Sequence, residues 1–188
     1  MTNQKRIIVP GSILIAEPFM SDPNFKRSVV LVCEKDEKDG VVGFVLNKKM
    51  NLSINEILQD FPEFESQVYF GGPVATDTIH YIHDVGDILE ESIPVYENIS
   101  WGGDFNQLKL LIERELVLPR NIKFFVGYTG WSPGQLEEEL DSDSWIVSDM
   151  DFNYAFYKTP DLLWKNSLIN KGDVFTVISQ MPDSKFDN

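Results

Sequence analysis

Cysteine is nearly absent from this sequence: Cys33 is the only one, so no disulfide can form within the chain. Disulfides are rare in reducing compartments and common in oxidising ones, so a reducing compartment is expected. Apolar runs are short as well, and none approaches the roughly 20 residues of a membrane-spanning helix. The first residues lack the apolar core and the small-residue cleavage site of a signal peptide. We therefore expect a cytoplasmic protein with no membrane partner.

Basic residues are few: 16 Lys and Arg stand against 30 Asp and Glu, which gives a formal net charge of −14 at pH 7. Lys and Arg supply most nucleic-acid affinity by neutralising phosphates, and an acidic surface repels the phosphate backbone. The basic pairs at 5–6, 26–27 and 48–49 do not extend into a patch, and no helix-turn-helix signature is present. We expect no direct nucleic-acid partner.

Metal-ligating residues are also scarce, because His80 and His83 are the only histidines. They lie in a segment whose pattern predicts a strand, where residues three apart point to opposite faces. A structural zinc site usually needs several cysteines, and Cys33 stands alone. The negative charge of Glu34 raises the pKa of the neighbouring Cys33 thiol. A thiol with a high pKa is a poor nucleophile, because the thiolate is the reactive form. We expect no metal, no cofactor and a buried structural cysteine.

Apolar and aromatic residues are plentiful, with 43% hydrophobic content and 13 Phe, 6 Tyr and 4 Trp. At 188 residues, without an internal repeat or a linker, the chain is expected to form one domain, 1–188. Nearly continuous apolar residues at 29–33 and 41–46 predict strands covered on both faces. Strands are expected at 12–17, 28–33, 41–47, 68–70, 78–83, 93–99, 122–128 and 152–157, with a hairpin connection at 35–40. Several strands joined directly, with few helices, indicate the α+β class.

Three predicted helix starts carry a capping box, in which a Ser or Asp caps the helix and a Glu or Gln three residues later reaches back. These boxes lie at 53–56, 104–107 and 132–135. A fourth helix is predicted from 159–160, because proline favours the first helical position, and it should end before Gly172.

Two glycine-containing motifs are candidates for a site. Gly71-Gly72-Pro73 follows a predicted strand, but neither a P-loop nor a dinucleotide fingerprint is complete, so a tight turn is the preferred interpretation. The segment 127–137 is the densest motif, and capping and hydrophobic stapling explain most of it. They do not explain Gly134 as an early helical residue, where glycine destabilises. Close approach of another segment or of a ligand would explain that glycine.

The same segment, G-Y-T-G-W-S-P-G-Q-L-E-E-E, resembles the hallmark of the AlgH/YqgE family of small bacterial proteins. Further matching segments lie at 11–18, 22–30, 43–47 and 71–74, followed by Trp145, Thr159-Pro160 and Trp164. The resemblance covers about residues 11–180. It implies a single-domain α+β fold with a mostly antiparallel or mixed, partly barrel-like sheet flanked by helices. It implies no established enzymatic activity, cofactor or catalytic residues, and one branch of the family is called a transcriptional regulator.

The leading hypothesis is a non-enzymatic cytoplasmic binding or regulatory protein that acts on transcription indirectly, with an unknown protein or a small molecule as partner. Its contact surface would be formed by 22–28, 71–74 and 129–137. The candidate site residues are Asp22, Arg27, Gly71, Gly72, Pro73, Trp131, Gly134, Gln135 and Glu137.

An enzyme acting on a small anionic molecule is the alternative, with Arg27 as the anion clamp and Asp22 or Glu137 as the base. Glu137 lies early in a predicted helix, where the helix dipole favours carboxylates for structural reasons, so a catalytic role for it is disfavoured. Direct DNA binding is least favoured. A pocket converging on Arg27 would favour the enzyme, and a flat apolar patch would favour a partner-binding surface.

Overall fold

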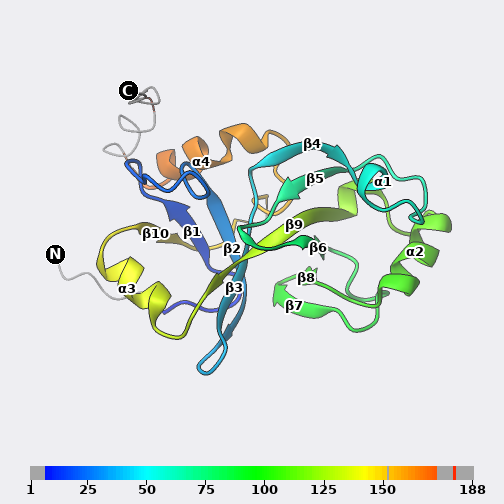
Figure 1. The fold of residues 1–188 in the computed structure, drawn as a ribbon, viewed down its shortest axis with the longest axis horizontal. Coiled ribbons are helices and arrows are strands. Elements are labelled where there is room, and N and C mark those ends of the chain that lie inside the picture. The colour runs from blue at the N-terminus through cyan, green and yellow to red at the C-terminus, as the bar shows by residue number, and fades with distance from the viewer. Residues whose placement is uncertain (1–6, 152, 173–179, 181–188) are drawn as a thin grey trace.

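The structure, a computed structural model, describes residues 7–151, 153–172 and 180 (Figure 1). Within these ranges it contains ten strands, four α-helices and one 3-10 turn. The strands are β1 Ile13–Ala16, β2 Val29–Asp36, β3 Gly40–Val45, β4 Lys49–Ser53, β5 Gln67–Phe70, β6 Val74–His83, β7 Ile93–Tyr96, β8 Ile99–Trp101, β9 Ile122–Trp131 and β10 Trp145–Ser148. The helices are α1 Ile54–Ile57, α2 Phe105–Glu113, α3 Gln135–Asp141 and α4 Pro160–Ile169, and the 3-10 turn is η1 Pro119–Asn121.

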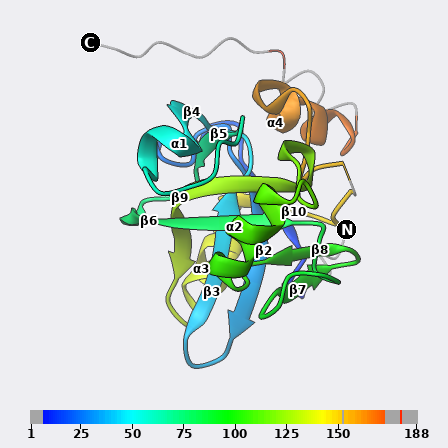
Figure 2. The same ribbon diagram turned by 90° about the vertical axis from the view of Figure 1, so that its right-hand side faces the viewer.

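All ten strands belong to one sheet, with neighbours in the order β10-β1-β2-β3-β9-β6-β8-β7 and with β4 and β5 attached beside β9. β5 runs parallel to β9, and the other described pairings are antiparallel. The long β9 crosses the middle of the molecule (Figure 1 and Figure 2) and changes neighbour from β5 to β3 along its length. The α+β class and the mostly antiparallel sheet are confirmed, and the sheet does not close into a barrel.

Side chains that alternate along the central strands fill separate clusters on the two faces of the sheet. On one face Ile13 and Leu31 pack with Trp164 of α4. On the other face Leu14 packs with Leu136 of α3, which explains why β2 and β3 are apolar on both sides, as predicted. α1 and α2 lie at the end of the molecule opposite α3 (Figure 1) and cover a third cluster around β5, β6 and β9.

The sheet curls round the cluster beneath α4. Val95 of β7 and Ile99 of β8 lie in this cluster together with Ile13 of β1, although these strands are far apart in the sheet order. Gly11 lies so close to Tyr96 of β7 that a side chain at position 11 would crowd that ring. The curvature therefore brings the two ends of the sheet towards each other.

Local sequence signals position most helices correctly. The Glu56 carboxylate accepts a hydrogen bond from the backbone N–H of Ser53 (2.7 Å), and α1 begins at the next residue. The Asp104 carboxylate accepts from the backbone N–H of Gln107 (2.8 Å) at the start of α2. α4 begins at Pro160, as predicted from the proline.

Two strand predictions need correction, and two strands were not predicted. The strand predicted at 152–157 is wrong for 153–157, which form turns, and residue 152 lies outside the described residues. The strand predicted at 93–99 is instead a hairpin of β7 and β8, because Glu97 adopts a left-handed φ of 45° between them. β4 and β10 were not predicted, because their sequences, KMNLS and WIVS, carry only a short apolar signal.

Candidate functional site

The Gly71-Gly72-Pro73 motif lies against β3 and β9 and allows the backbones to pack closely. The Gly71 carbonyl accepts hydrogen bonds from the backbone N–H of Val45 (2.9 Å) and from the Thr129 hydroxyl (3.0 Å). A Cβ atom on Gly71 would overlap the carbonyl oxygen of Gly127, and one on Gly72 would overlap the backbone of Tyr128. These glycines allow β9 to approach closely, and Pro73 follows them on the surface.

Trp131 belongs to a buried pair of indoles held by one carboxylate. The rings of Trp131 and Trp145 pack edge to face at 5.9 Å between centroids. Both indole N–H groups donate to Oε2 of Glu139, at 2.9 and 2.8 Å, and the Gln135 amide donates to its Oε1 at 3.0 Å. Trp131 and Gln135 are therefore brought together by Glu139, which ends the motif but is not among the candidate site residues.

The third capping box is only half formed. α3 begins at Gln135, so Gly134 precedes the helix, with a left-handed φ of 84°. The Gln135 side chain accepts from the backbone N–H of Ser132 (3.0 Å), but the Ser132 hydroxyl makes no hydrogen bond within the described residues. No atom of the described chain lies within 4 Å of a Cβ built on Gly134, so close approach of another segment is wrong as an explanation. The left-handed backbone explains this glycine.

Gly134→Ala is expected to lower the free energy of unfolding by about 1 kcal/mol, because an L side chain is strained in the left-handed region. Thermal melts of the variant check this. Gly134→Asn is the matched control and should lose less, since asparagine tolerates that conformation better. An alanine variant that melts above the parent protein would show that the backbone relaxes into an ordinary helical turn.

The three residues of the proposed anion clamp and base are engaged separately. Glu137 forms an ion pair with Lys35 of β2 (2.9 Å). The Arg27 guanidinium lies 5.1 Å from the ring centroid of Trp164 in α4. Asp22 accepts from the backbone N–H of Asn24 (2.8 Å) in an exposed turn. None of the three lines either of the two cavities described below.

The packing and hydrogen bonds of the two histidines and the cysteine indicate structural roles for all three. The ring of His80 packs near Phe44 and that of His83 near Tyr81. His83 is buried, with Nε2 2.8 Å from the Gly102 carbonyl oxygen, and burial lowers its pKa. Burial, and secondarily the charge of Glu34, raises the pKa of the Cys33 thiol. Across the described ranges, no group of three or more His, Cys, Asp or Glu side chains is placed to hold a metal ion.

A cavity of about 340 Å³ lies between β4, β5, the start of β9 and the segment before α4. We call it the Lys123 pocket. It is lined by Lys49, Glu65, Ser66, Gln67, Tyr69, Pro119, Arg120, Ile122, Lys123, Phe156, Tyr157 and Lys158. Four of these side chains are cationic and only one is acidic, although the chain as a whole has a net charge of −14. The pocket therefore reverses the sign of charge that dominates the protein.

Lys123 is the buried cation of this pocket, with 5% of its surface exposed. Its ammonium donates to the Leu46 carbonyl oxygen (3.1 Å) and lies 4.3 Å from the centroid of the Tyr69 ring. Burial, with the positive charge of Lys49 as a second cause, lowers the pKa of Lys123 to about 7. Lys49, Arg120 and Lys158 are exposed, so they form the rim of the pocket while Lys123 lies at its base.

Sequence reasoning missed this pocket because its cations come from three separate segments of the chain, around residues 49, 120–123 and 158. One signal was present: Lys123 stands inside the apolar run Ile122–Val126, in a strand with a buried interior. A lysine is rarely fully buried unless it is paired, so such a residue marks a site worth examining.

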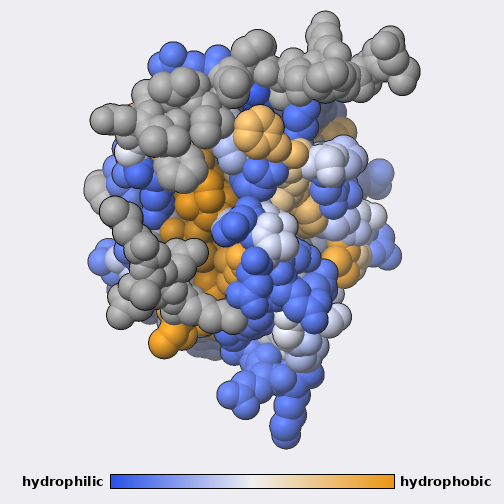
Figure 3. Space-filling view, turned by 90° about the vertical axis from the view of Figure 1, so that its left-hand side faces the viewer, coloured by the Kyte–Doolittle hydropathy of each residue, from blue (hydrophilic) through white to orange (hydrophobic). Residues whose placement is uncertain are grey.

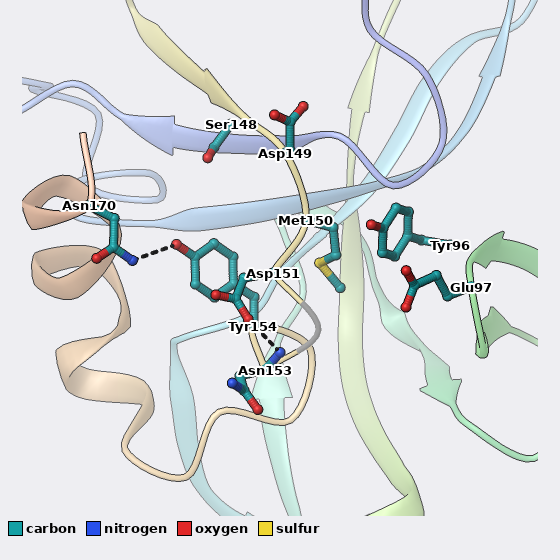
Figure 4. A pocket seen from close by; sticks show the side chains of 9 residues that line it. All are labelled: Tyr96, Glu97, Ser148, Asp149, Met150, Asp151, Asn153, Tyr154 and Asn170. Atoms are coloured by element: carbon teal, nitrogen blue, oxygen red, sulfur yellow. Dashed lines mark hydrogen bonds between the residues drawn. The ribbon is translucent and has the colours of Figure 1, made fainter.

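A second cavity, of about 580 Å³, has the opposite character (Figure 4). Tyr96 and Glu97 lie on one side of it, while Tyr154 accepts a hydrogen bond from Asn170, just after α4 (3.3 Å), on the other. Its three ionisable acids are Glu97, Asp149 and Asp151. Its negative charge matches that of the whole chain and disfavours anions. The face of the molecule on the left of Figure 1 is largely hydrophilic around a smaller apolar area, where the described residues are in view (Figure 3).

Comparison with known proteins gives a consistent result. A family model described as AlgH-like matches residues 13–175. A UPF0301 protein of Chlorobaculum tepidum is 38% identical over 183 residues, 97% of each chain. A UPF0301 protein of Cytophaga hutchinsonii is 40% identical over 177 residues, which cover 94% of this chain and 97% of the relative.

Two solved structures share the fold. The solution structure of the AlgH protein from Pseudomonas aeruginosa superposes with a TM-score of 0.74, at 25% identity and with 97% of this chain and 98% of that one covered. The crystal structure of a Corynebacterium diphtheriae protein gives a TM-score of 0.75 at 19% identity, with 94% of each chain covered, and so shows the fold alone. Among the residues that the structure describes, no helix has the length and apolar character needed to cross a membrane.

Proposed function

We propose that this chain, which belongs to the AlgH-like family, is a binding protein for small organic anions and that the Lys123 pocket is its binding site. The observation that carries the proposal is a buried lysine at the base of a pocket with three cations on its rim, in a protein that is otherwise acidic. The net negative charge of the protein repels an anion, whereas the cations of this pocket attract it.

Lys123 retains hydrogen-bonding capacity for a ligand. An ammonium group carries three N–H donors. Within the described part of the chain its nitrogen makes one hydrogen bond, to Leu46, and one ring contact, with Tyr69. The remaining donors can form charge-assisted hydrogen bonds with a carboxylate or phosphate, which are stronger than neutral ones.

The other lining residues favour an anion with a flat apolar part. The aromatic rings of Tyr69, Phe156 and Tyr157 line the pocket together with Ile122. Its volume of about 340 Å³ falls at the small end of ligand pockets, which suits a metabolite-sized molecule. Aromatic and aliphatic carboxylates or phosphates have this combination of charge and apolar surface.

The regulatory role belongs to the same proposal. The protein acts in the cytoplasm, the anion is its signal, and the response reaches transcription through a protein partner and not through direct contact with DNA. A net charge of −14 supports the indirect route, because it opposes association with a phosphate backbone.

A titration with benzoate, followed by backbone NMR at about pH 6, tests the binding site. We expect saturable shifts at Tyr69, Ile122 and Lys123, because these residues line one pocket. Lys123→Met should weaken binding by about tenfold or more, the effect of losing one charge-assisted hydrogen bond. The matched control, Lys38→Met, removes an exposed lysine from the β2–β3 hairpin and should leave the affinity unchanged.

The affinity should also fall as the pH rises from about 6 to 8, because Lys123, with a pKa of about 7, loses its charge over this range. The proposal fails if benzoate gives only weak shifts spread over the surface, or if Lys123→Met binds as well as the parent protein.

A further inference from the structure

We infer that Lys123 captures its ligand covalently, by forming an imine with an organic anion that carries an aldehyde or ketone group, such as a 2-oxo acid. This inference rests on the proposed anion-binding function and adds the chemical class of the ligand. It follows from where the amine lies relative to the charges on the rim of the pocket.

The pocket separates the charge-binding groups from the amine. Arg120 and Lys158 are exposed at the rim, where they meet the acidic group of an entering molecule, while the Lys123 amine lies buried at the base. An anion whose carboxylate is held by Arg120 or Lys158 can turn its carbonyl group towards Lys123, in place of the contact between carboxylate and Lys123 ammonium that reversible binding uses. Holding two reactants together in this way makes their condensation effectively unimolecular.

The surroundings of the amine favour its nucleophilic form. Lysines that react with carbonyl groups are activated by desolvation or by a neighbouring cation. Lys123 has both, since it is 5% exposed and the charge of Lys49 acts on it. With a pKa of about 7, roughly half of the Lys123 amines are unprotonated at neutral pH, against roughly one in 3,000 for an ordinary lysine.

The reaction is a condensation without oxidation or reduction. The nitrogen lone pair attacks the carbonyl carbon, a C–N bond forms, and the carbonyl oxygen takes up two protons, one from the amine and one from solvent. The oxygen then leaves as water when the nitrogen lone pair forms the C=N bond, and the second amine proton returns to solvent, so that no proton is consumed overall. Hydrolysis reverses each step, so the ligand is released intact, as a regulatory binding protein requires.

Reductive trapping tests this inference. The full chain is incubated with pyruvate and cyanoborohydride at about pH 7, digested and mapped by mass spectrometry. We expect one reduced pyruvate adduct, on Lys123, formed on the order of tenfold faster than at the exposed Lys38, because far more of the Lys123 amine is unprotonated. Excess benzoate should suppress the Lys123 adduct, since both anions occupy one pocket.

Lys123→Arg is the matched variant, because it keeps a positive charge and cannot form an imine. It should yield no adduct in the pocket, whereas Lys38→Met, which leaves the pocket intact, should form the Lys123 adduct as the parent protein does. If the parent protein binds pyruvate reversibly but gives no adduct, or adducts scattered over exposed lysines, the covalent inference is wrong and the anion-binding function stands. If neither pyruvate nor benzoate binds, both are wrong. Mapping of the parent protein decides the question even if the arginine variant does not fold.

Discussion

Lys123→Met is expected to melt at a higher temperature than the parent protein while losing its response to anions. At neutral pH a buried lysine destabilises the fold, because folding must either desolvate the ammonium or remove its proton. Methionine has a similar shape and no charge, and replacement of buried charges by apolar side chains is often stabilising. A gain of about 2 kcal/mol, allowing for the lost hydrogen bond to Leu46, would raise the Tm by roughly 4–8 °C in a chain of this size.

The pH dependence identifies the cause of that gain. The pKa of Lys123 falls from its ordinary value of 10.5 to about 7 in the folded protein, so between these values the unfolded chain binds one more proton there than the folded chain does. Stability therefore rises with pH across this window, and this contribution of Lys123 to stability is greatest above the unfolded pKa. The Tm advantage of Lys123→Met should accordingly shrink as the pH rises from about 7 to 10. Lys38→Met should show neither effect.

A variant that melts well below the parent protein at all pH values would mean that Lys123 is retained for its hydrogen bond and ring contact. Binding sites often hold residues that reduce stability in exchange for function. The combination of higher stability and lost binding distinguishes such a residue from a structural one.

Glu139→Ala is expected to cause a large loss of stability on the α3 side of the sheet. Its carboxylate accepts both indole N–H groups of Trp131 and Trp145, which are 4% and 5% exposed. A buried donor left without an acceptor costs about 1–3 kcal/mol. We expect a loss of about 3 kcal/mol and a Tm lowered by roughly 6–12 °C, measured by thermal melting.

Two further variants separate the hydrogen bonds from the helix itself. Glu138→Ala removes an exposed carboxylate from the same helix and should change stability by less than about 0.5 kcal/mol. Glu139→Gln keeps one carbonyl acceptor and should fall between the parent protein and Glu139→Ala. Equal losses in Glu138→Ala and Glu139→Ala would contradict the role given to the indole pair.

The elements that the sequence predicts well are those specified by neighbouring residues. The capping interactions of Ser53 with Glu56 and of Asp104 with Gln107 each span three residues, and both helices begin where they indicate. At Gly134 the same pattern failed, because the backbone enters a left-handed turn that the capping box does not encode. The polar strand β4 has too few apolar residues to be recognised without its partner β5.

The candidate site could not be predicted from local sequence patterns, because its residues are distant in the sequence. Lys49, Arg120 and Lys158 meet only because β9 crosses the molecule between β5 and β6 and the chain returns before α4. Two motifs stood out in the sequence, and both are explained by packing. Gly71-Gly72 allows close packing of strands, and Trp131 belongs to the buried indole pair. Lys123, a charged residue inside a buried strand, was more informative than these motifs, because packing alone does not account for a buried lysine.

The titration of the Lys123 side chain itself, followed by NMR of lysine-labelled protein with and without benzoate, tests the central claim most directly. In the free protein we expect a pKa of about 7 for Lys123, and saturating benzoate should raise it, since a bound anion favours the ammonium form. Lys123→Met identifies the resonance by its disappearance. A Lys123 that titrates near 10.5 and does not respond to benzoate would contradict the account of this pocket as an anion site.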